Sequence, residues 1–115
     1  MYNIVFEIAS DAVVELPKYN TDTFALLDEV RKELAASNLF IKENFNEVNI
    51  DIKSESIASD GRYTVKVRWH DLYYCEIAAI SDSEAIMSAK ESIMKRYPSI
   101  NFTFAVANIQ QGVIT

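Results

Sequence analysis

The sequence of 115 residues contains few of the residues that interrupt secondary structure, form disulfides or bind metal ions. It has two glycines, two prolines, one cysteine (Cys75) and one histidine (His70). A lone cysteine excludes an intrachain disulfide, and one Cys with one His cannot form a structural zinc site. Two glycines, Gly61 and Gly112, are too few for a glycine-rich phosphate loop. This composition is typical of packed elements joined by short loops, so we expect one domain over residues 1–115.

Long apolar runs and an excess of positive charge are also missing. No segment approaches the roughly 18 apolar residues of a membrane span, and the first apolar run breaks at Glu7 without a basic region before it. We therefore expect a cytoplasmic protein without membrane contact. The net charge is −6, and residues 1–57 hold eleven acids against five bases. An acidic surface opposes phosphate contacts, which argues against direct nucleic-acid binding and leaves either a basic partner or plain solubility.

The first half of the chain predicts a strand, a connector and a helix. Alternating apolar residues indicate a strand over residues 2–8, and residues 9–20 carry turn signals. The helix is expected to begin near Thr21-Asp22-Thr23 and to end at Asn38. Its predicted core positions are Phe24, Leu27, Val30 and Leu34.

The middle of the chain predicts a meander of three strands. Residues 48–57 and 62–69 alternate around Asp60-Gly61, a tight-turn signal. A two-residue turn places Ile52 opposite Trp69, and Glu55 opposite Lys66 on the outer face. A three-residue loop at His70-Asp71-Leu72 then begins a third strand over residues 73–80. This loop keeps Glu76 outside, beside Lys66, because a buried unpartnered carboxylate costs several kcal/mol.

The last part of the chain predicts a helix and a strand. Ser81 and Glu84 form a capping box, in which Glu84 reaches back to the backbone N–H of Ser81. Ile86, Ala89, Ile93 and Tyr97 form the expected buried stripe of this helix, and Pro98 ends it. A strand follows from Ile100, and residues 110–115 are expected to fray.

These elements predict an α+β fold of one two-layer sandwich, in the order β-α-β-β-β-α-β. The sheet is expected to have about five mainly antiparallel strands, with two helices on one face. In outline the order resembles a ferredoxin-like split β-α-β domain with one added strand. That resemblance concerns architecture, and such folds carry many unrelated functions.

No constellation in the sequence indicates catalysis. His70 and Asp71 are neighbours without a third group, and the predicted register buries Cys75 among core residues. The acids lack a calcium-loop pattern, and Lys53, Lys66 and Arg68 would pair with carboxylates of the sheet. The strand aromatics fall in phase with the core, unlike the exposed rings of RNA-recognition domains. We therefore expect no enzyme, no cofactor and no metal.

Two surfaces are candidates for binding. The first is the acidic face of the first helix, which could steer a basic partner. The second is the sheet face away from the helices, charged at one end and apolar at the other, which suits association or a homodimer. A segment of the same chain could equally cover that apolar end. The predicted partner-binding residues are Asp22, Asp28, Glu29, Glu33, Arg68, Tyr74 and Ile80.

The function that fits these surfaces is a small acidic interaction or regulatory protein. One class with this character is the phage or mobile-element inhibitor that occupies the nucleic-acid site of a host protein. The alternative is a domain that binds or sequesters a small molecule in a pocket between helices and sheet.

Overall fold

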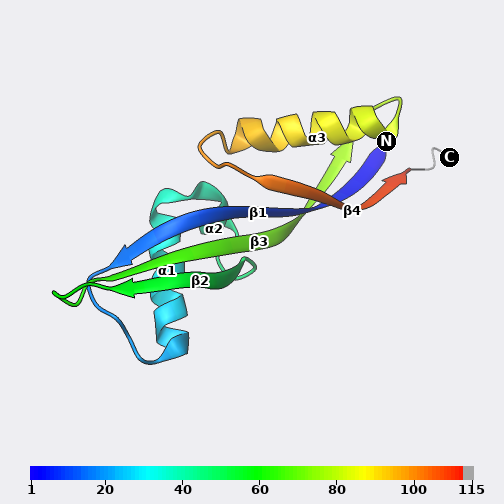
Figure 1. Cartoon of the computed structure of the whole chain (residues 1–115). Coiled ribbons are helices and arrows are strands. Elements are labelled where there is room, and N and C mark those ends of the chain that lie inside the picture. The colour runs from blue at the N-terminus through cyan, green and yellow to red at the C-terminus, as the bar shows by residue number, and fades with distance from the viewer. Residues whose placement is uncertain (113–115) are drawn as a thin grey trace. The chain divides into compact units, whose positions relative to one another are not determined.

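The computed structural model describes residues 1–112 and is an α+β fold of four strands and three helices (Figure 1). The strands are β1 (Tyr2–Leu16), β2 (Asn49–Ile57), β3 (Tyr63–Ile77) and β4 (Thr103–Gln111). The helices are α1 (Thr23–Ser37), α2 (Leu39–Glu43) and α3 (Asp82–Arg96). The sheet has the order β2-β3-β1-β4. The described residues therefore form four strands, whereas the sequence predicted about five.

The chain divides into two compact units, and the long strands β1 and β3 contribute one segment to each. Ser10–His70 form the first, called the α1 unit. Met1–Ala9 and Asp71–Thr115 form the second, called the α3 unit. The two units are described separately below.

The α1 unit is built around one face of β3. Tyr63, Val65, Val67 and Trp69 are buried on this face, as the alternation predicts. Helix α1 buries Leu26, Val30 and Leu34 in this unit, and the Phe40 ring of α2 stacks on Trp69 with the ring centroids 5.4 Å apart. This core holds α1 in place, so the outer side of α1 is presented to solvent.

Helix α1 begins and ends where the sequence indicates. The Asp22 side chain accepts hydrogen bonds from the backbone N–H groups of Phe24 and Ala25. Asn38 ends the helix with an extended backbone rather than a left-handed one, and its side chain then caps α2 by accepting from Ile41 N. Asn38 therefore serves as the boundary of both helices.

The predicted register of the β2–β3 hairpin is wrong. The structure pairs Ile50 with Trp69 and Ile52 with Val67, and a bulge between Ile52 and Ser54 shifts the later pairs. Glu55 consequently lies opposite Val65 instead of Lys66. The two-residue turn is replaced by residues 58–62, in which Ala58 N bonds Arg62 O and Gly61 N bonds Ala58 O. Gly61 has φ +90°, a value that favours glycine.

The predicted hairpin at residues 70–72 is also wrong, because β3 continues through it. Odd-numbered positions from Tyr63 to Ile77 keep the same phase, and half-buried Asp71 occupies one of them. No non-glycine residue of the described chain has a positive φ, so the backbone at residues 70–72 does not form a tight turn. Residues 78–80 lie beyond the strand, which ends at Ile77.

Strand β1 likewise continues through the predicted connector at residues 9–20. Its even-numbered positions stay inward, with Ser10, Val14 and Leu16 buried, and Pro17 follows its last residue. Ser10-Asp11 is therefore part of the strand and not a turn.

In the α3 unit, α3 packs beside β4 and β1 pairs with β4 (Figure 1). Ser81 caps α3 by accepting from Glu84 N, as predicted, but Glu84 accepts from Ile80 N instead of Ser81 N. The helix buries Ala85, Ala89 and Ile93, so the stripe includes Ala85 where Ile86 was expected. The helix ends at Arg96, two residues before Pro98.

Strand β4 begins at Thr103 and extends further than predicted. Gln110 pairs with Asn3 and Gln111 with Tyr2, so the first part of the expected frayed tail is strand. The rest of that prediction, residues 113–115, lies outside the described residues.

Candidate protein-binding surface

The outer face of α1 exposes a phenylalanine. Phe24 is 86% exposed in the first turn, whereas the sequence pattern placed it in the core. The correction follows from helix geometry, because two residues turn a helix by about 200°. Leu26 leads the buried row that continues to Val30 and Leu34, so Phe24 points away from it. Phe24 is therefore available for contact with a partner, and aromatic side chains are among those that contribute most to protein–protein binding.

Exposed charged side chains follow Phe24 along α1. Asp28 is four residues further on and pairs with Lys32 across 2.9 Å between carboxylate and ammonium. Glu29 and Glu33 are exposed beside them. Asp22, just before the helix, is occupied as its cap. The four acids predicted to bind a partner are therefore exposed, and the sequence analysis missed that Phe24 is exposed as well.

Arg31 does not neutralise this face, because it is turned toward the α2–β2 connection. Its Nη1 donates to the backbone carbonyls of Phe45 at 2.7 Å and Val48 at 2.5 Å. The guanidinium also lies 5.8 Å from the centre of the Phe45 ring. The outer face of α1 is consequently more acidic than its sequence suggests.

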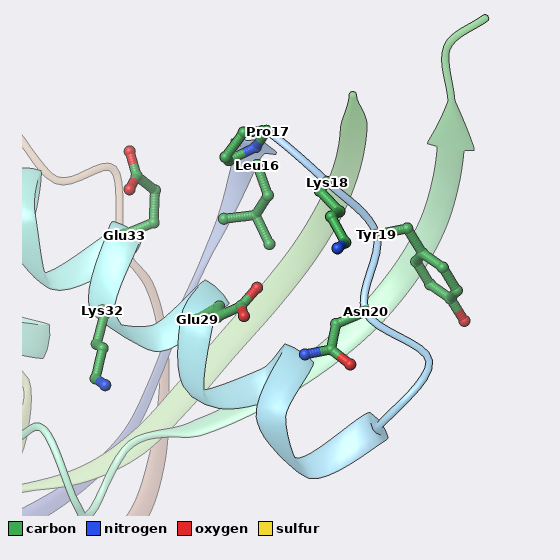
Figure 2. A pocket seen from close by; sticks show the side chains of 8 residues that line it. All are labelled: Leu16, Pro17, Lys18, Tyr19, Asn20, Glu29, Lys32 and Glu33. Carbon is green, nitrogen blue, oxygen red and sulfur yellow. The ribbon is translucent and has the colours of Figure 1, made fainter. Parts of the chain in front are cut away.

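A groove lies next to this face (Figure 2). It has a volume of about 480 Å³ and is formed by residues 16–20 on one side and by Glu29, Lys32 and Glu33 of α1 on the other. Leu16 and Asn20 point toward α1, whereas the Tyr19 ring points away from it. The groove joins two of the predicted binding residues, Glu29 and Glu33, in one site.

Tyr19 packs on a tyrosine whose hydroxyl has no hydrogen bond. The rings of Tyr19 and Tyr63 are 5.2 Å apart, and Tyr63 is fully buried. Among residues 1–112, no donor or acceptor lies in hydrogen-bonding geometry with the Tyr63 hydroxyl. Burial raises the pKa of Tyr63, and the Glu55 carboxylate raises it further because it is close enough to favour the protonated hydroxyl, although its oxygens do not reach hydrogen-bonding geometry. No sequence pattern predicts this unpaired group.

Arg68 lies on the opposite face of the α1 unit's strands, within a set of ion pairs. Arg68 Nη1 is 3.1 Å from the Asp11 carboxylate, and His70 Nε2 is 3.3 Å from that of Asp51. Asp51 does pair with Arg68 in the strand register, yet its carboxylate contacts His70.

The two predicted partners of Lys66 are both elsewhere. Glu55 is on the inner face, and Glu76 lies ten positions further along the same strand. Lys66 instead lines a hollow of about 390 Å³ together with Lys53, Asp11 and Val13. Of the two basic residues Lys66 and Arg68, Arg68 is therefore paired by a carboxylate of β1, and Lys66 lies opposite neither of its predicted partners.

The remaining predicted binding residues, Tyr74 and Ile80, belong to the α3 unit. Both are exposed, Tyr74 on β3 and Ile80 in the segment before α3. Cys75 is half-buried, and burial raises the pKa of its thiol, which disfavours the reactive thiolate. Tyr74, Cys75 and Glu76 line a hollow of about 300 Å³ with residues 3–5.

Within residues 1–112, no group of three or more His, Cys, Asp and Glu side chains could hold a metal ion. No helix in that range has the length and apolar character to cross a membrane. Comparison with protein-family models, with curated proteins and with solved structures gives no significant match. The functional argument therefore rests on the surfaces described above.

Proposed function

We propose that this chain is a non-catalytic interaction protein that binds another protein through the outer face of α1. The observation that supports this most is Phe24, an exposed aromatic side chain one helical turn before the exposed Asp28. Binding sites commonly centre on an aromatic anchor surrounded by polar residues, and such anchors carry most of the binding energy. The partner would present an apolar recess with basic side chains around it.

A basic recess of this kind is common in nucleic-acid-binding proteins. An acidic helix that occupies such a recess would compete with phosphate, which is how inhibitors of the phage or mobile-element type act. We therefore propose regulation of a nucleic-acid-binding protein in the cytoplasm as the biological role, without direct contact between this chain and nucleic acid.

The fold does not select this function. The element order, with α1 and α2 between β1 and β2, and the strand order β2-β3-β1-β4 resemble the ferredoxin-like split β-α-β arrangement. That arrangement carries many unrelated functions. The expected placement of both helices on one face of a two-layer sandwich stays a prediction.

The test compares matched aromatic variants. Immobilised wild type, Phe24→Ser and Tyr74→Ser are exposed to extract from the natural source cell. We expect a basic protein to bind the wild type and Tyr74→Ser equally, and Phe24→Ser at least tenfold more weakly. Retention should also fall as salt rises, because exposed charges are screened. Equal binding by wild type and Phe24→Ser would contradict the proposal.

The groove beside α1 supports a second candidate, a small-molecule site. Its volume of about 480 Å³ lies in the range of ligand pockets, and both charge signs line it, with Lys18 on one side and Glu29, Lys32 and Glu33 of α1 on the other. Native mass spectrometry of protein from its natural source tests this candidate. A retained ligand that is lost in Glu29→Gln/Glu33→Gln would support it, and a bare chain mass would oppose it.

A further inference from the structure

Strand β4 is an edge strand of the sheet. It pairs only with β1 in the order β2-β3-β1-β4, so its outer backbone groups have no strand partner among the described residues. Most of its nine residues are exposed. An edge of this kind is a template for pairing with another strand.

This edge has little that would prevent such pairing. Proteins protect exposed edges with charged side chains, proline, short strands or bulges. Strand β4 contains neither a charged residue nor a proline, and no charged side chain follows Arg96 in the sequence. One bulge, where Ala107 is left without a partner on β1, is its only such device.

Exposed apolar side chains of α3 lie beside the β4 edge, and together with that edge they are called the β4 margin. The Lys90 ammonium lies 5.7 Å above the centre of the Phe104 ring, which fixes one side of α3 next to β4 (Figure 1). Met87 and Met94 are three residues before and four residues after Lys90, so they share its side of the helix. They are 63% and 45% exposed, and Val106 of β4 is 40% exposed.

We propose that β4 pairs antiparallel with β4 of a second copy of this chain, with Met87 and Met94 packing against the partner's α3. A two-fold axis would present the same margin from both chains, which is the usual geometry of a dimer. The net charge of −6 does not oppose this contact locally, because neither β4 strand carries a charge at the seam. The edge of a second copy therefore matches this one, because both are uncharged and both can be related by a two-fold axis.

Light scattering across a concentration series tests the proposal. We expect the wild type to approach twice the mass of one chain as concentration rises. Met87→Glu/Met94→Glu, on an exposed helix face, and Val106→Lys, on the edge strand, should remain at the mass of one chain. Phe24→Ser in the α1 unit is the control and should dimerise as the wild type does, which separates this test from that of the proposed function.

Hydrogen exchange distinguishes the seam from other contacts. Amides of residues 103–111 should exchange more slowly in concentrated than in dilute wild type, and this difference should vanish in Met87→Glu/Met94→Glu. Because the helix variant leaves β4 unchanged, circular dichroism of its monomer shows whether the fold is retained. A wild type that stays monomeric at the highest concentration, or a dimer that survives both variants, would overturn the proposal. Binding of a foreign extended peptide to a monomer would do so as well.

Discussion

At the scale of single residues, the Tyr63 hydroxyl is the least satisfied group in the described core. It is fully buried without a hydrogen-bond partner, while its ring packs on Tyr19. Burial of a hydroxyl without a partner costs about 1–3 kcal/mol. The ring therefore contributes to stability, and the oxygen opposes it.

Removal of that oxygen should stabilise the protein. We expect Tyr63→Phe to raise the free energy of unfolding by about 1 kcal/mol, because the ring contact stays and the desolvation cost is lost. Tyr63→Leu should lower it, since the contact with the Tyr19 ring is lost and a cavity is left. Urea denaturation followed by circular dichroism measures both. A marked loss of stability in Tyr63→Phe would show that the hydroxyl has a partner after all.

The same scale shows where sequence reasoning is strong and where it fails. The alternation of Tyr63, Val65, Val67 and Trp69 predicts their burial correctly, because β side chains alternate strictly. Phe24 fails because hydrophobicity alone does not fix the phase of a helix against its core. A shift of two residues places Leu26 in the core and leaves Phe24, an expected core residue, on the surface.

At the scale of elements, Arg31 joins α1 to the connection between α2 and β2. Its guanidinium donates hydrogen bonds to the backbone carbonyls of Phe45 and Val48. Without Arg31, these carbonyls would need water as their hydrogen-bond donor. Hydrogen bonds from a charged donor to partly buried acceptors stabilise by about 1.5–3 kcal/mol. This contact fixes the entry of the chain into β2.

Arg31→Ala should therefore cost about 2 kcal/mol of folding free energy. The matched control is Lys32→Ala, the next residue on the same helix. Lys32 makes an exposed ion pair with Asp28, and its removal should cost no more than about 0.5 kcal/mol. Urea midpoints of the two variants measure the difference, and equal midpoints would show that the Arg31 contact does not contribute.

Helix boundaries were predictable because their signals are local. Asp22, Asn38 and Ser81 act through backbone groups two or three residues away. The long strands were not predictable in full, because Ser10-Asp11 and His70-Asp71 have the composition of turns. The unbroken phase of the buried positions was the better signal, and it extends through Ser10 in β1 and Asp71 in β3.

At the scale of the whole molecule, the two units carry different surfaces. The α1 unit holds an exposed phenylalanine on an acidic helix, and the α3 unit holds an uncharged edge strand beside exposed methionines. The first suits a basic protein and the second suits another copy of this chain. Composition predicted the acidic character of the first half, but only the strand order identifies β4 as an edge.

The central claim is that Phe24 contacts a protein partner, and site-specific photo-crosslinking tests it directly. A photoreactive phenylalanine analogue is placed at position 24, and in a second variant at Ser37, the exposed last residue of the same helix. After irradiation in the natural source cell, position 24 should give one discrete crosslinked product. Its mass should differ from that of two copies of this chain, which identifies the second component as a different protein. Excess wild-type protein should suppress this product by competition. Position 37 should give none. Absence of an adduct from position 24, or the same adducts from both positions, would contradict the account.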